Sequence, residues 1–62
     1  MRIHFSSDSN AQHFQYDVED NIGVDVLRRD GEIEIQTTDL SADEQFRIEM
    51  IALDYGGQII EP

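Results

Sequence analysis

Residues 24–37 read VDVLRRDGEIEIQT, and this stretch decides the fold. Apolar residues at every second position predict two strands, in residues 24–28 and 32–37, with valines and isoleucines inward and glutamates outward. Between them, Asp30-Gly31 is a dipeptide typical of a tight two-residue turn, because both residues tolerate positive φ. The stretch therefore predicts a β-hairpin that buries one face of a sheet.

A capping box marks the start of the clearest predicted helix. Ser41 is followed three residues later by Glu44, so each side chain can bond the backbone N–H of the other. We expect the helix to run to about Tyr55, where Gly56-Gly57 ends it. Residues 58–61 then predict a short final strand.

The first third of the chain leaves two alternatives open. Residues 2–6 predict a strand, but residues 11–22 fit either a helix or a strand. A helix would place Ala11, Phe14, Val18 and Ile22 in one stripe, and Ser9 with Gln12 would cap it. A strand would instead alternate the residues Phe14, Tyr16 and Val18 with polar neighbours.

The helical alternative gives the order strand, helix, strand, strand, helix, strand. This order predicts a compact ferredoxin-like split βαβ fold of the α+β class, in which two helices cover one face of a four-stranded antiparallel sheet. The other alternative is an antiparallel β-meander with one C-terminal helix. In both cases residues 1–62 form a single acidic domain.

The charge balance excludes several classes of protein. The 62 residues contain fourteen Asp or Glu and four Arg, which gives a formal net charge of −10, and there is no Cys. Phosphate and anionic lipid would repel such a chain, so we expect no direct nucleic-acid binding and no membrane partner. Thiol chemistry is excluded, no signal-peptide core follows Met1, and a cytoplasmic location is the expectation.

The candidates for catalysis are weak. His4, Ser7 and Asp8 can be written as a hydrolytic set, but no nucleophile elbow or oxyanion loop accompanies them. Glu32 and Glu34 share a strand face, as solvated residues commonly do. We therefore expect a non-enzymatic protein with no catalytic residue, no cofactor and no metal site.

The second predicted helix carries two apolar stripes on opposite sides. A helix packed on a sheet needs only one such stripe. One explanation for the second stripe is packing against the first helix and the sheet edge. Another is that part of the set Ile48, Ile51 and Tyr55 is exposed and forms a homodimer or partner surface. The first stripe comprises Ala42, Phe46, Met50 and Leu53. The second comprises Ile48, Ile51, Ala52 and Tyr55.

Acidic residues concentrate in the middle of the chain, which suggests a binding surface. Carboxylates can take the place of phosphates in the basic groove of a nuclease, a restriction or CRISPR effector, a polymerase or a repressor. An exposed aromatic residue (Tyr16 or Tyr55, with Phe14 as a further candidate) would fix the register. The predicted partner-binding residues are Tyr16, Asp17, Glu19, Asp20, Asp25, Asp30, Glu32 and Glu34.

The C-terminal part of the chain, with Ile51-Ala52-Leu53-Asp54-Tyr55-Gly56-Gly57 before a final strand, resembles the regulator of ribonuclease E activity B family. The resemblance implies an acidic protein with a ferredoxin-like core that inhibits a ribonuclease by binding it. A second hypothesis stays open, in which the chain is a small homo-oligomeric module for interaction or ligand sensing. Such a module would associate through the Ile48, Ile51 and Tyr55 stripe or through the exposed edge of a strand.

Overall fold

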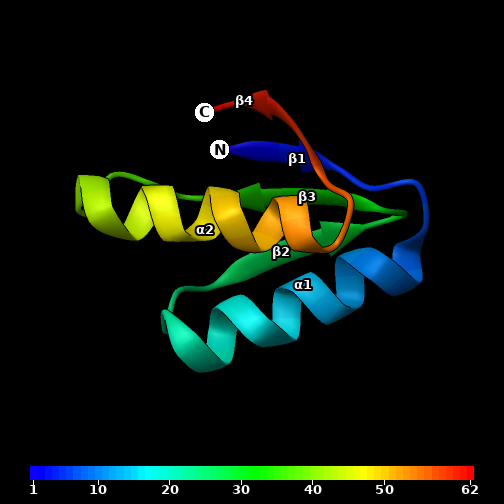
Figure 1. Cartoon of the computed structure of the whole chain (residues 1–62), viewed down its shortest axis with the longest axis horizontal. Helices are drawn as coiled ribbons and strands as arrows, with labels where there is room; N and C mark the ends of the chain where they lie inside the picture. The colour runs from blue at the N-terminus through cyan, green and yellow to red at the C-terminus, as the bar shows by residue number, and fades with distance from the viewer.

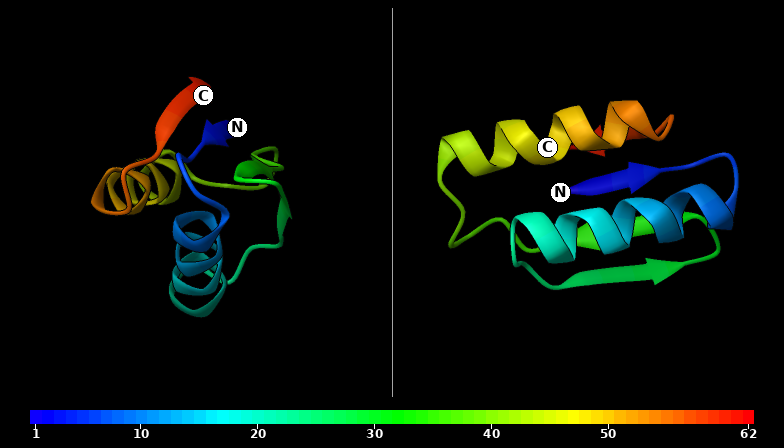
Figure 2. Two further views of the ribbon diagram at one scale, coloured as in Figure 1. Left: turned by 90° about the vertical axis from the view of Figure 1, so that its right-hand side faces the viewer. Right: turned by 60° about the horizontal axis from the view of Figure 1, so that its bottom comes forward.

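The computed structural model describes all 62 residues as one antiparallel sheet with two helices (Figure 1). Both helices lie on the same face of the sheet, whose strand order is β2-β3-β1-β4 (Figure 2). This is the ferredoxin-like split βαβ arrangement, so the predicted fold class is confirmed and the meander is excluded. The elements are β1 (Arg2–His4), α1 (Asp8–Asn21), β2 (Val26–Arg29), β3 (Glu32–Ile35), α2 (Ala42–Asp54) and β4 (Gln58–Glu61).

Burial explains why the ambiguous segment is a helix. Ala11, Phe14 and Val18 are completely buried, as the helical spacing requires. The predicted cap at Ser9 is wrong, because the N-cap is Ser7, whose hydroxyl accepts a hydrogen bond from the backbone N–H of Asn10 at 3.2 Å. The earlier start brings Asp8 into the first turn, beside the positive end of the helix dipole.

The hairpin turn has the predicted geometry. Asp30 and Gly31 have φ of 51° and 83°, and Arg29 pairs with Glu32 across the two-residue loop. The backbone of Gly31 accepts a hydrogen bond from the N–H of Phe5 at 2.9 Å, and a Cβ on this glycine would lie 3.0 Å from the Phe5 carbonyl oxygen. The turn is therefore packed against the end of β1.

Ten apolar residues form the core between the sheet and the helices. The ring centroids of Phe5 and Phe14 lie 5.1 Å apart and the rings are tilted. Because Phe5 directly follows β1 and Phe14 lies in the middle of α1, this contact joins the strand to the helix. The buried apolar residues are Ile3, Phe5, Ala11, Phe14, Val18, Val26, Ile33, Ile35, Ile48 and Ala52.

The two apolar stripes of α2 correct the sequence-based interpretation. Ile48 is completely buried, and Ile51 and Tyr55 are half-buried against the core. Ile48 is therefore removed from the predicted dimer surface and packs in the core, whereas Ile51 and Tyr55 keep part of their surface exposed. The stripe that begins at Ala42 faces solvent instead, because a helix lying on a sheet can bury only one side.

Candidate protein-binding surfaces

The face of the sheet that no helix covers carries alternating charges. Strand pairing sets Glu34 between Leu27 and Arg2, and Glu32 between Arg29 and His4. The Nδ1 atom of His4 contacts the carboxylate of Glu32 directly. We call this surface the open face. Its glutamates alternate with cationic and imidazole groups, so they do not form the acidic patch that the sequence predicted.

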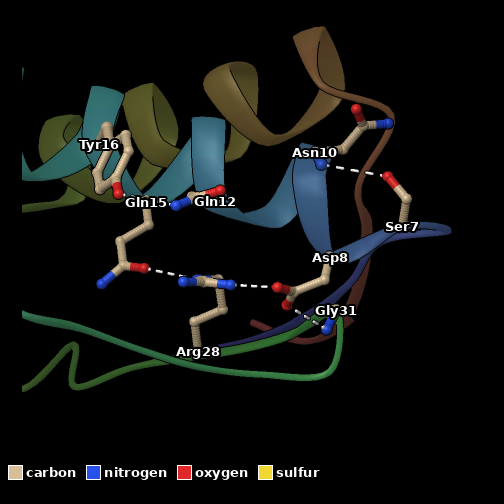
Figure 3. Close-up of polar contacts among 8 residues, drawn as sticks. All are labelled: Ser7, Asp8, Asn10, Gln12, Gln15, Tyr16, Arg28 and Gly31. Carbon is tan, nitrogen blue, oxygen red and sulfur yellow. Dashed lines mark hydrogen bonds and ion pairs between the residues drawn. The ribbon is translucent and has the colours of Figure 1, made fainter.

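Asp30 lies at the hairpin end of the molecule, next to Glu32 and at the opposite end of β2 from Asp25. The neighbouring Asp8 accepts hydrogen bonds from the backbone N–H of Gly31 at 2.9 Å and from Arg28, whose Nε in turn donates to Gln15 at 2.9 Å (Figure 3). The Gly31 N–H, followed by Arg28, lowers the pKa of Asp8. This network fastens the start of α1 to the hairpin and is a structural feature rather than a docking surface.

The opposite end of the molecule is strongly acidic. The helices are antiparallel, so the end of α1 and the start of α2 lie together with the α1–β2 and β3–α2 connections (Figures 1 and 2). We call this region the acidic end. Its carboxylates are Glu19, Asp20, Asp25, Asp39, Asp43 and Glu44.

None of these six carboxylates forms an ion pair with an arginine. Arg2 pairs with Glu61 and Arg28 pairs with Asp8, and the imidazole of His4 contacts Glu32; all three contacts lie outside the acidic end. The last turn of α1 contains no basic residue, although its free carbonyl groups make that helix end negative. The negative field at this end is therefore available to an external cation.

Carboxylates at the acidic end affect the stability of the two helices in opposite ways. Glu44 lies in the first turn of α2, where the backbone N–H of Ser41, followed by the Ser41 side chain, lowers its pKa. That capping box was predicted correctly. Glu19 and Asp20, in contrast, lie at the negative end of α1, where acidic side chains oppose helix formation.

The predicted aromatic anchors differ in accessibility. Phe14 is completely buried, which removes it as an anchor. Tyr55 is half-buried and its hydroxyl donates to Asp17 at 2.9 Å, while the Asp17 side chain also accepts from Asn21. Tyr16 remains 53% exposed, so it is the only one of the three that is open to a partner.

Sequence reasoning missed the most exposed apolar surface. Phe46, Met50 and Leu53 are 61%, 46% and 61% exposed, and their spacing places them side by side along α2. We call these three residues the apolar ridge. Each of the two stripes contains one alanine (Ala42 and Ala52), so residue size did not indicate which stripe would be buried.

A shallow groove of ≈ 350 Å³ runs between the two helices beside the apolar ridge. Ile51 lines the groove on the α2 side, and Asp17 lines it on the α1 side. The groove is continuous with the acidic end, because its α1 wall reaches the last helical residue. The lining residues are Asp17, Asn21, Phe46, Arg47, Met50 and Ile51.

The structure does not assemble the hydrolytic set considered from the sequence. His4 faces Glu32 on the open face, whereas Asp8 is bound to Gly31 and Arg28. No group of three or more His, Cys, Asp or Glu is arranged to hold a metal ion, and no helix has the length and apolar character to cross a membrane. Comparison with protein-family models, curated proteins and solved structures finds no match for the chain.

Proposed function

We propose that this chain is a small non-enzymatic protein that binds a basic protein and regulates it by occupying its charged groove. The observation that carries the proposal is the acidic end, where six carboxylates lie without an ion pair to an arginine and Arg47 is the one arginine near them. A protein that used acidity only for solubility could distribute its carboxylates evenly. Here one end of the molecule is negative, while the open face is of mixed sign.

Electrostatics supports such a function in two ways. A concentrated negative field steers a basic partner during diffusion and accelerates association, an effect that salt screens. Like charges also repel phosphate, so the chain competes with nucleic acid for a partner without binding nucleic acid itself. Association should therefore be fast and sensitive to salt.

The class of partner follows from the same chemistry. Proteins with deep basic grooves include nucleases, restriction and CRISPR effectors, polymerases and repressors, and all of them bind phosphate chains there. The resemblance of residues 40–61 to the regulator of ribonuclease E activity B family favours a ribonuclease among these. In this proposal the acidic end takes the place of the nucleic acid.

The test compares two triple variants that remove the same number of charges. Glu19→Gln/Asp25→Asn/Asp39→Asn neutralises the acidic end, and Glu32→Gln/Glu34→Gln/Asp30→Asn neutralises the open face and the hairpin tip. Binding and inhibition are measured against a panel of purified basic nucleases at low and high salt. We expect the first variant to lose binding and inhibition and the second to retain both.

Two results would contradict the proposal. Equal losses in both variants would mean that net charge alone, rather than the acidic end, governs binding. Failure of the parent protein to bind any basic nuclease at low salt would also exclude it. Circular dichroism of each variant verifies that the fold is intact.

A further inference from the structure

We infer that the groove between α1 and α2, with the apolar ridge along it, is a docking site for a basic amphipathic helix of the partner. The inference rests on the proposed function, because it describes one element of the partner proposed there. The groove would add an apolar contact to the electrostatic attraction between the acidic end and the partner. The acidic end would attract the partner, and the groove would hold it in one register.

The apolar ridge has the dimensions of a helix-binding surface. Phe46, Met50 and Leu53 lie within eight consecutive residues, and the rise from the first to the last is about 10 Å or two helical turns. Isolated apolar side chains on a surface are ordinary, but three in one row on a chain of charge −10 form a continuous strip beside a groove. Burial of Phe46 and Met50 would provide the anchoring contacts that small interfaces need.

The walls of the groove favour a helix over an extended peptide. Both walls are helices, whose backbone N–H and C=O groups are already bonded within each helix. A strand laid there would find no backbone partners, and its own polar groups would be left unpaired. A helix satisfies its backbone internally and presents side chains at three- and four-residue spacing to the ridge.

Charge around the groove favours a basic helix. Asp17 lines the α1 wall and Asp20 follows it by three residues on the same side. On α2, Asp43 and Asp54 share one side with Arg47, at spacings of four and seven residues. These four carboxylates outnumber the one guanidinium, so the groove has an excess of negative charge. Lysine or arginine on the flanks of the bound helix would complement it.

The same charges argue against a second copy of this chain as the occupant. Two copies joined through Phe46 and Met50 would bring both sets of carboxylates together, and each chain carries a net charge of −10. An anionic membrane would be repelled in the same way. The basic helix is the occupant whose charge complements both walls of the groove.

The probe for this site is a fluorescently labelled synthetic peptide of leucine and lysine in helical period. A peptide of the same composition in strict alternation, which favours a strand, is the control. The variant Phe46→Ala/Met50→Ala removes the ridge, and Leu27→Ala/Ile60→Ala removes two exposed apolar residues elsewhere. Fluorescence anisotropy gives Kd, and amide chemical shifts of Asn21, Arg47 and Ile51 locate the bound peptide.

We expect the helical peptide to bind the parent protein and to shift the groove amides. Binding should weaken about tenfold or more in Phe46→Ala/Met50→Ala and stay unchanged in Leu27→Ala/Ile60→Ala. The inference is overturned if the alternating peptide binds equally well, if both double variants bind alike, or if no peptide binds. It is also overturned if sedimentation shows a ridge-dependent homodimer, or if phosphatidylcholine vesicles bind through the ridge.

The two proposals fail in different ways. If the parent protein inhibits basic nucleases but Phe46→Ala/Met50→Ala leaves peptide binding unchanged, the groove inference fails and the proposed function stands. If the peptide binds through the ridge but no basic nuclease is bound, the proposed function fails and the groove remains a helix-binding site. The nuclease panel and the peptide titration are therefore run on the same set of variants.

Discussion

Tyr55 at the end of α2 donates its phenolic hydrogen to Oδ2 of Asp17 in α1, with 2.9 Å between the two oxygen atoms. The same ring lies 6.4 Å from that of His13, so one residue holds the two helices together. Because Asp17 also lines the groove, the bond fixes one groove wall relative to the other. The spacing between the helices is thus set by a polar contact as well as by the core.

The first prediction concerns the removal of this bond. Tyr55→Phe should lower the melting temperature by a few degrees at neutral pH, because Asp17 loses one of its donors. The hydrogen bond to Asp17 and partial burial raise the pKa of Tyr55 above its ordinary value of 10.0. This stabilisation is therefore complete below pH 10 and is lost as the pH rises through the higher folded pKa.

Thermal melts of both proteins across the alkaline range provide the measurement. The difference between parent and Tyr55→Phe should shrink above pH 10, and Tyr16→Phe serves as the control because the Tyr16 hydroxyl contacts only Gln12. A difference that persists unchanged at strongly alkaline pH would mean that Tyr55 acts through its ring alone.

The second prediction concerns acid. The pKa of Asp8 is lowered from 3.8, first by the Gly31 N–H and then by Arg28, so its ionised form stabilises the fold. That stabilisation is present above pH 3.8 and is lost as the pH falls through the lower folded pKa. Asp8→Asn should melt at a lower temperature than the parent at neutral pH, and the two should converge in strong acid.

A companion variant separates the two causes. Arg28→Gln keeps the Gly31 bond, which is the larger cause, so it should reproduce only the smaller part of the loss. A difference in melting temperature between parent and Asp8→Asn that grew in acid would be opposite to the expected pH dependence. It would exclude the ionised Asp8 carboxylate as the stabilising group.

The third prediction tests which side of α2 is buried. Ile48→Ala should destabilise the fold by about 2–5 kcal/mol, because it opens a cavity in the core. A domain of this size has a total stability of about 3–5 kcal/mol, so this variant should be largely unfolded. Met50→Ala, on the exposed stripe, should change the stability by no more than about 0.5 kcal/mol.

Chemical denaturation of both variants gives the two free energies of unfolding. The reverse order, with Met50→Ala the more damaging, would mean that α2 lies on the sheet through its other stripe.

The fourth prediction concerns the two adjacent glycines after α2. A Cβ at Gly57 would lie 2.7 Å from Cε1 and Cζ of Phe5, whereas Gly56 has open space but a φ of 76°. Gly57→Ala should therefore cost about 1–3 kcal/mol through overpacking, and Gly56→Ala about 1–2 kcal/mol through backbone strain. Denaturation of single and double variants distinguishes the causes.

Phe5→Leu removes the two ring atoms that the new methyl group would meet. In combination with Gly57→Ala, it should partly offset the loss in free energy of unfolding. In combination with Gly56→Ala, the two losses should add. Additive losses in both cases would rule out the contact with Phe5 as the reason for the glycine.

Local sequence signals predicted most of the fold correctly. The Asp30-Gly31 turn and the Ser41/Glu44 capping box depend on neighbouring residues, so the sequence contains all the information they need. The order of strands and helices along the chain then allows only a few strand orders in the sheet. The cap of α1 was misplaced by two residues, because Ser7 and Ser9 are equally good caps and the contacts with Gly31 and Arg28 decide between them.

The candidate binding surface was harder to predict, because it depends on long-range geometry. Asp25 and Asp30 are close in the sequence, but β2 separates them and places them at opposite ends of the molecule. Glu34 looked like part of an acidic strip until pairing with β1 set it beside Arg2. The two stripes of α2 are similarly apolar, so the choice between them depended on the shape of the sheet beneath.

The missing basic residue at the end of α1 has a thermodynamic consequence. Asp20 and its neighbours oppose the helix dipole there, which makes the last turn of α1 the part of the helix that opens most easily. A cation that bound the folded form at this point would relieve the repulsion and, by linkage, raise the free energy of unfolding. The free protein is therefore less stable than the same fold would be with a basic residue in the last turn of α1.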